Sequence, residues 1–150
     1  MSNSIAIGVA YLDQDIDGGT IGATNPKPIT GTVIYATSQL GYSDVAYGTV
    51  TQTGNKAAAV TLNKTAGTIT TSNAQMAPNA DVAFVVNNTQ VSVLDTVIVN
   101  IASGATATFA YLVAIVTVTD GAFTVNLSNV SNNAYTDILK INFSILHVNS

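Results

Sequence analysis

The sequence predicts an all-β fold, an antiparallel β-sandwich of the jelly-roll or Greek-key type. Three observations support this class. Glutamate and arginine, both strong helix formers, are absent from the 150 residues, whereas the strand-favouring Val, Ile and Thr are among the commonest. Short segments of alternating apolar and polar residues recur from residue 45 onward, separated by turn-forming residues. No amphipathic helix is evident, so the sandwich is expected to consist of strands and loops.

The predicted strands follow one another at short intervals. Their expected ranges are 45–51, 57–62, 67–71, 82–87, 96–101, 111–119, 123–128 and 138–147. Phe123–Ser128 alternates most cleanly, and the Asp120-Gly121 pair before it is a strong hairpin signal. The most helix that we expect is one turn at Thr70–Met76, closed by Pro78. The side chains expected in the core are Phe84, Val86, Val97, Val99, Phe123, Val125, Leu127, Ile141 and Phe143.

Residues 1–44 are predicted to form an extended N-terminal segment, and residues 45–150 the sandwich domain. Within the segment, Ile5–Leu12 is strand-like, and its small residues would let another backbone approach closely. Two interpretations are open: an edge strand folded on the same sandwich, or an arm laid on a neighbouring subunit. The residues that we expect at such a subunit interface are Ile5, Ile7, Gly8, Val9 and Tyr11.

Alternating carboxylates at Asp13, Asp15 and Asp17, followed by two glycines, look like the start of a calcium-binding loop. An EF-hand loop needs a bidentate carboxylate at its twelfth position, which is Thr24 when counted from Asp13. Position 9 is Ile21, and no helices flank the run. We therefore expect a solvated turn rather than a metal site, with the three aspartates as weak candidate ligands.

Composition argues against most chemical activities. Only 8% of the residues are charged, the net charge is −4, and four lysines form no basic patch, which argues against binding to nucleic acid. Cysteine is absent, and one histidine, His147, is a poor basis for acid–base catalysis. We expect no enzymatic activity and no cofactor. Tyr42 and Tyr47, in a loop-like stretch, are the candidate exposed aromatics.

The sequence also predicts where the protein is made and whether it enters a membrane. The first residues lack the positive n-region and long apolar core of a signal peptide. No apolar run approaches the ~20 residues that span a bilayer. We therefore expect synthesis in the cytoplasm and no association with a membrane.

Ordered motifs between Gly48 and Leu146 resemble a β-sandwich module of tailed-bacteriophage virion proteins. In sequence order they are GTVTQ, K-x₃-VTLN, G-x-ITT, D-x-VxVN, SGAT and F-x-V-x-L-x-NVS, followed by a last apolar strand. The resemblance implies a non-enzymatic capsid decoration (cement) protein that binds the major capsid protein on the outer surface of the virion and associates with itself as a homodimer or homotrimer. The alternative is a head-fibre or tail-fibre component that recognises a host surface or a glycan.

Overall fold

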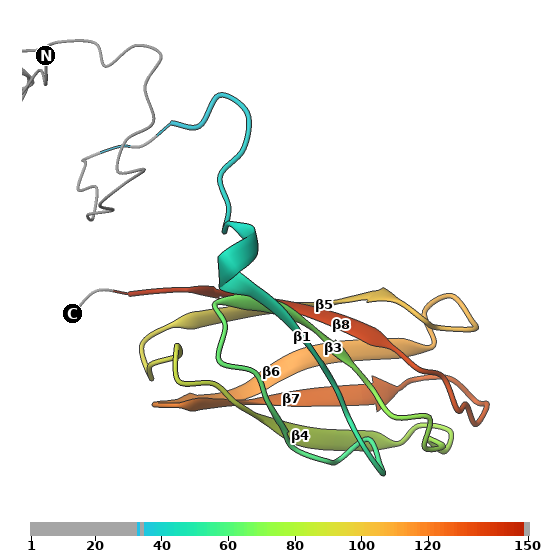
Figure 1. The fold of residues 1–150 in the computed structure, drawn as a ribbon. Helices are drawn as coiled ribbons and strands as arrows, with labels where there is room; N and C mark the ends of the chain where they lie inside the picture. Colours follow the sequence, from blue (N-terminus) through green and yellow to red (C-terminus); the bar gives the residue numbers. More distant parts are fainter. Residues whose placement is uncertain (1–32, 34, 149–150) are drawn as a thin grey trace, which may run out of the picture. The chain divides into compact units, whose positions relative to one another are not determined.

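The computed structural model describes Val33 and residues 35–148 (Figure 1). The chain divides into two units, Met1–Gln39 and Leu40–Ser150. The candidate interface residues at positions 5–11 and the three aspartates at positions 13, 15 and 17 lie outside the described residues. The predicted boundary at residue 44 falls close to the start of the second unit, which contains the sandwich.

Two four-stranded sheets form the sandwich. The first contains, in spatial order, β1 (Tyr47–Thr51), β3 (Ala66–Thr70), β8 (Lys140–Leu146) and β5 (Thr96–Ser103). The second contains β2 (Val60–Thr61), β4 (Asp81–Asn87), β7 (Ala122–Asn129) and β6 (Tyr111–Thr119). A single 3₁₀ turn, η1 (Asp44–Ala46), precedes β1. The predicted all-β sandwich is confirmed.

Strand pairing is mixed rather than purely antiparallel, which corrects the predicted arrangement. β1 pairs parallel with β3, and β2 pairs parallel with β4, whereas the other pairs are antiparallel. The cause is that the chain alternates between sheets over its first four strands. After β1 it crosses to β2 in the opposite sheet, and it re-enters the first sheet at the end where β1 began.

The core lies between the sheets, where the apolar faces of alternating strands meet. Every side chain predicted to face it is buried except Val99, which is half-buried and packs against the same cluster. The rings of Phe123 and Phe143 come from opposite sheets and have centroids 5.3 Å apart, tilted by 56°. Leu127 belongs to a second, smaller cluster with Met76 and Leu139.

The β6–β7 hairpin forms at Asp120-Gly121 as predicted, with Gly121 at φ 80°. The helical turn predicted at Thr70–Met76 is wrong. There, the Thr71 N–H donates to the Leu139 carbonyl at 2.8 Å, while the Thr71 hydroxyl accepts from the Leu139 N–H at 2.9 Å. Partners distant in sequence satisfy these groups, so the segment remains extended. The predicted strand 57–62 shortens to β2 because its first residues belong to a loop around Lys56.

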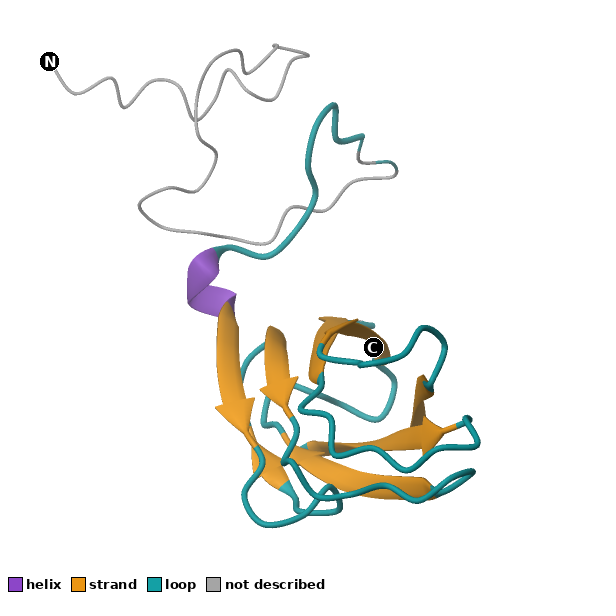
Figure 2. Cartoon of the chain, turned by 90° about the vertical axis from the view of Figure 1, so that its right-hand side faces the viewer, coloured by secondary structure: helices purple, strands orange, loops and turns teal. Residues whose placement is uncertain are grey.

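We call one end of the sandwich the distal end. Here β1, β3, β5 and β7 finish, and β4, β6 and β8 begin, as the strand registers require. It is the right-hand side of Figure 1, and Figure 2 looks directly onto its loops. The loops gathered there are residues 52–57, 71–80, 104–110 and 130–139.

Candidate functional site

A buried lysine occupies the distal end. The side chain of Lys56 is 3% exposed in a chain with only four lysines. Its ammonium group donates to the Thr71 hydroxyl at 3.2 Å and to the backbone carbonyls of Ser72 and Asp137 at 2.6 Å each. Burial lowers the pKa of Lys56, and the negative charge of Asp137 opposes that shift. With three acceptors for its three N–H bonds, the ammonium fastens three loops together and is not free to act as a nucleophile.

Asp137 holds the neighbouring loop. Its carboxylate accepts hydrogen bonds from the Thr106 N–H at 2.8 Å and from the Thr106 hydroxyl at 2.5 Å. Burial acts to raise the pKa of Asp137, but the Thr106 bonds, the nearby Tyr111 hydroxyl and the Lys56 ammonium together hold it below its usual value. The carboxylate is therefore ionised at neutral pH and joins the 104–110 loop to the 130–139 loop.

Tyr111 completes this cluster from the start of β6. Its hydroxyl is buried without a well-formed hydrogen bond in the described part of the chain, although it lies near the Asp137 carboxylate. Burial, followed by the negative charge of Asp137, raises the pKa of Tyr111 to about 12. The ring also packs on Tyr135, with centroids 6.0 Å apart. A phenol that holds its proton so firmly is not a general base at neutral pH.

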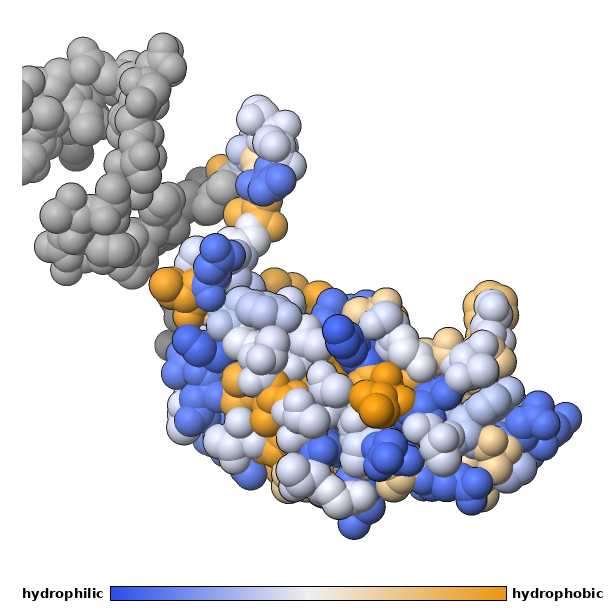
Figure 3. Space-filling model, turned by 45° about the vertical axis from the view of Figure 1, so that its right-hand side comes forward, coloured by the Kyte–Doolittle hydropathy of each residue, from blue (hydrophilic) through white to orange (hydrophobic). Residues whose placement is uncertain are grey.

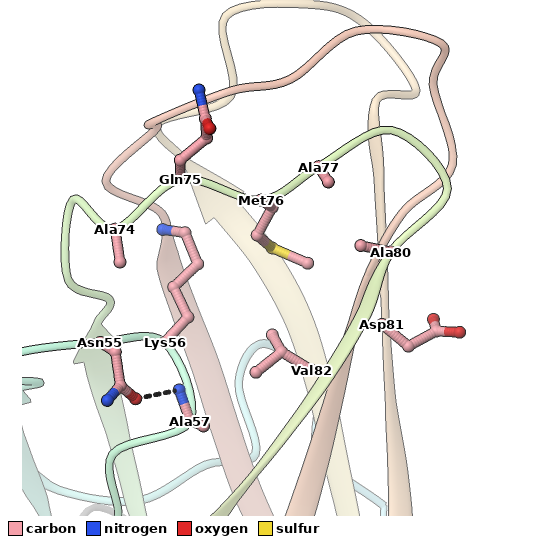
Figure 4. Close-up of a pocket in the computed structure, with 10 residues that line it drawn as sticks. All are labelled: Asn55, Lys56, Ala57, Ala74, Gln75, Met76, Ala77, Ala80, Asp81 and Val82. Atoms are coloured by element: carbon pink, nitrogen blue, oxygen red, sulfur yellow. Dashed lines mark hydrogen bonds between the residues drawn. The ribbon is translucent and has the colours of Figure 1, made fainter.

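Beside this cluster is a pocket with a cavity volume of about 300 Å³ (Figure 4). Its walls come from the 52–57 and 71–80 loops and the start of β4. Figure 4 shows Met76 and Val82 turned toward the shared space, with the alanines Ala74, Ala77 and Ala80 around it, while the Asp81 carboxylate points away. The lining is mostly small and apolar, which suits the binding of an apolar group better than catalysis.

The opposite end of the sandwich contains the only histidine. Nδ1 of His147 lies 3.0 Å from a carboxylate oxygen of Asp95, whose side chain is almost fully buried. That carboxylate also accepts the backbone N–H groups of Ser92 at 2.8 Å and Val148 at 3.0 Å. The hydrogen bond from Ser92 has the largest effect and lowers the pKa of Asp95. Burial acts in the opposite direction, whereas the bonds from Val148 and His147 lower the pKa further, to about 2. The pair therefore fastens residues 147–148 to the loop before β5.

This tie predicts a specific acid sensitivity. The unfolded Asp95 titrates near a pKa of about 3.9, so its folded-state bonds stabilise the protein above that pH and are lost as the pH falls from about 4 to 2. In thermal melts between pH 7 and pH 2, Asp95→Asn should melt lower than wild type at pH 7 and lose less stability across the acid range. Asp44→Asn, on exposed η1, is the control and should follow wild type. Parallel curves for wild type and Asp95→Asn would contradict the role of this carboxylate.

The two tyrosines named as candidate aromatics both carry half-exposed rings. The Tyr42 hydroxyl donates to the Ile145 carbonyl, and the Tyr47 hydroxyl lies 2.7 Å from Oγ1 of Thr68. Burial, and then the charge of Asp95, raises the pKa of Tyr42. The hydroxyls are thus used inside the sandwich, while a little under half of the surface of each residue remains exposed.

Within Val33 and residues 35–148, no group of three or more His, Cys, Asp or Glu side chains is placed to hold a metal ion. The same residues contain no helix long and apolar enough to cross a membrane.

Sequence reasoning missed the Lys56–Asp137 cluster. The run Asn55-Lys56-Ala57 has the composition of an exposed loop, and no neighbouring residue indicates that the lysine is buried against a segment about 80 residues later.

No protein-family model, no curated protein and no solved structure matches this chain.

Proposed function

We propose that the chain is a non-enzymatic structural protein that binds the outer surface of a tailed-bacteriophage capsid and stabilises it, as a decoration or cement protein. One observation carries the proposal: the charged clusters of the described sandwich are used to fasten its own loops, while apolar side chains and strand edges remain exposed. A protein with that distribution is suited to holding other proteins rather than to transforming a small molecule. The ordered motifs from Gly48 to Leu146 supply the capsid context.

Internal fastening fits a protein that must resist opening. Lys56 and Asp137 tie loops at the distal end, and Asp95 ties the opposite end. Buried Asn129 adds a third tie, because its amide donates to the carbonyls of Ala77 at 2.9 Å and Asn133 at 2.8 Å. Satisfied buried polar networks make a fold more rigid and specify one conformation.

The surface offers contacts for a lattice. β5 and β6 are edge strands of eight and nine residues without a charged residue, and neither has a second strand partner among the described residues. Such edges accept an added strand from another chain. Figure 3 shows small apolar patches scattered among hydrophilic residues on one face. Weak contacts of this kind gain strength when many copies meet a repeated lattice.

The docking element that we propose is Ile5–Leu12, outside the described residues. Deleting residues 1–20 should leave a sandwich that melts cooperatively but no longer binds heads. Gly8→Val should weaken binding with little change in melting temperature, because a bulky side chain blocks close approach of a second backbone. Asn3→Ala, before the strand-like stretch, is the matched control.

The measurement is to mix each variant with heads that lack this protein and to determine occupancy after sedimentation. Full occupancy by the deletion variant would remove Ile5–Leu12 from docking and leave the sandwich as the contact surface. If the deletion unfolds the protein, the segment is an edge strand of the fold.

A fibre protein that recognises a glycan is the second candidate. The half-exposed rings of Tyr42 and Tyr47 favour it, since sugars stack on open aromatic faces. Copy number separates the two functions. A decoration protein should co-purify with full heads at a number comparable to the major capsid protein, whereas a fibre protein should be present in far fewer copies.

A further inference from the structure

Phe109 is an exposed aromatic residue with a strained backbone conformation. It lies in the loop between β5 and β6 with φ 58°, a left-handed conformation that a bulky residue rarely adopts. Its side chain is 88% exposed, so the ring gains almost nothing from burial in its own chain. The loop projects beside β5 in Figure 1, and a narrow, partly apolar projection is seen at the same place in Figure 3.

The rest of the loop is held firmly. Asp137 binds Thr106 at both its N–H and its hydroxyl, and the Ala110 carbonyl accepts the Val130 N–H at 2.9 Å. Gly104 lies against the 130–139 loop so closely that a Cβ there would be 2.1 Å from the Ile138 carbonyl oxygen. Because these contacts fix the loop on both sides of Phe109, the backbone at Phe109 is held at its strained φ. Strained residues that a framework over-determines are concentrated at functional sites.

A pocket of suitable size for such a ring lies elsewhere at the same distal end. The pocket of Figure 4, about 300 Å³ in volume, has room for a benzyl group. Its apolar walls are formed by Ala57, Ala74, Met76, Ala77, Ala80 and Val82. Among the described residues, none of the 104–110 loop lines it, so the Phe109 ring of the same chain does not fill the pocket.

We propose that two copies of the chain associate through their distal ends, with each Phe109 ring inserted into the alanine-lined pocket of the other copy. Since ring and pocket lie at the same end, one two-fold axis brings both pairs together and closes the assembly. Charge does not oppose the contact: the 104–110 loop is uncharged, the Lys56 ammonium is used internally, and the Asp81 carboxylate accepts a hydrogen bond from Ser128. This association is independent of capsid binding and is tested without heads.

The first test is sedimentation equilibrium of the full chain over a wide concentration range. Wild type should dimerise, and Phe109→Ser should raise the dissociation constant about thirtyfold or more, as expected for an aromatic anchor. Leu94→Ser, an exposed residue at the opposite end, is the matched control and should leave the constant unchanged. A wild type that stays monomeric, or a Phe109→Ser variant that associates like wild type, overturns the proposal.

The second test asks whether the pocket is the receptor. Ala80→Phe places a ring of the pocket's own chain in the cavity and should prevent dimerisation while Phe109 is intact. Mixing Ala80→Phe with Phe109→Ser should restore heterodimers of intermediate strength, because one ring and one open pocket then meet. Melting curves check folding, and Ala57→Phe on the same pocket repeats the test if Ala80→Phe melts early. Failure of the mixture to associate, with both variants folded, excludes the pocket as receptor.

Discussion

Phe123→Ala should lower the free energy of unfolding by about 3–5 kcal/mol. Phe123 is 1% exposed near the start of β7, and its ring packs against Phe143 from the opposite sheet. Truncation removes that contact and the burial of the ring, and it leaves a cavity between two sheets that paired strands prevent from collapsing. The loss should therefore be at the upper end for a core substitution.

Denaturant titration followed by circular dichroism measures this loss, with the slope against denaturant checked for two-state behaviour. Thr124→Ala is the matched control, because the adjacent residue points to the outer face of the same strand and is only half-buried. It should change stability by less than about 0.5 kcal/mol. A loss below about 1 kcal/mol for Phe123→Ala would mean that the two faces of β7 are assigned wrongly.

The core was predictable because strand side chains alternate between two faces. In β7, the positions of Phe123, Val125 and Leu127 are all buried and the residues between them are not, as the sequence alternation indicates. The hairpin at Asp120-Gly121 was predictable for a similarly local reason, since glycine supplies the positive φ. Where a few neighbouring residues decide the structure, the sequence is sufficient.

Pairing between distant segments was not predictable. The parallel partners of β1 and β2 depend on the chain changing sheets at each step, which no local pattern records. The extended course of residues 70–76 depends on Leu139, and the burial of Lys56 depends on the carbonyls of Ser72 and Asp137. In each case the deciding partner is remote in sequence.

The candidate sites divide along the same line. Tyr42 and Tyr47 were selected from a loop-like context; both are about half-exposed, but Tyr47 is the first residue of β1 and does not lie in a loop. Phe109 was not identified, because its exposure and its positive φ follow from how Asp137 and Gly104 fix the loop. An aromatic residue in a short run of alanines and threonines gives no sign, by itself, that it faces solvent.

The second large effect should come from Gly104→Ala, which tests that loop directly. At φ 101° an alanine is strained by about 1–2 kcal/mol, and its Cβ would meet the Ile138 carbonyl oxygen at 2.1 Å. Moving the 130–139 loop aside should cost about 1–3 kcal/mol more. We therefore expect a total loss of about 2–5 kcal/mol in denaturant titration.

Gly121→Ala separates the two causes, because Gly121 has a similar φ of 80° but a Cβ there would meet nothing within 4 Å. Gly121→Ala should lower the free energy of unfolding only by the cost of backbone strain, about 1–2 kcal/mol. Equal losses for the two variants would show that the 104–110 loop yields easily. A loop that yields would also relax the φ of Phe109, and the ring would then no longer be held outward by its framework. A clearly larger loss at Gly104 is what a rigid support for that ring requires.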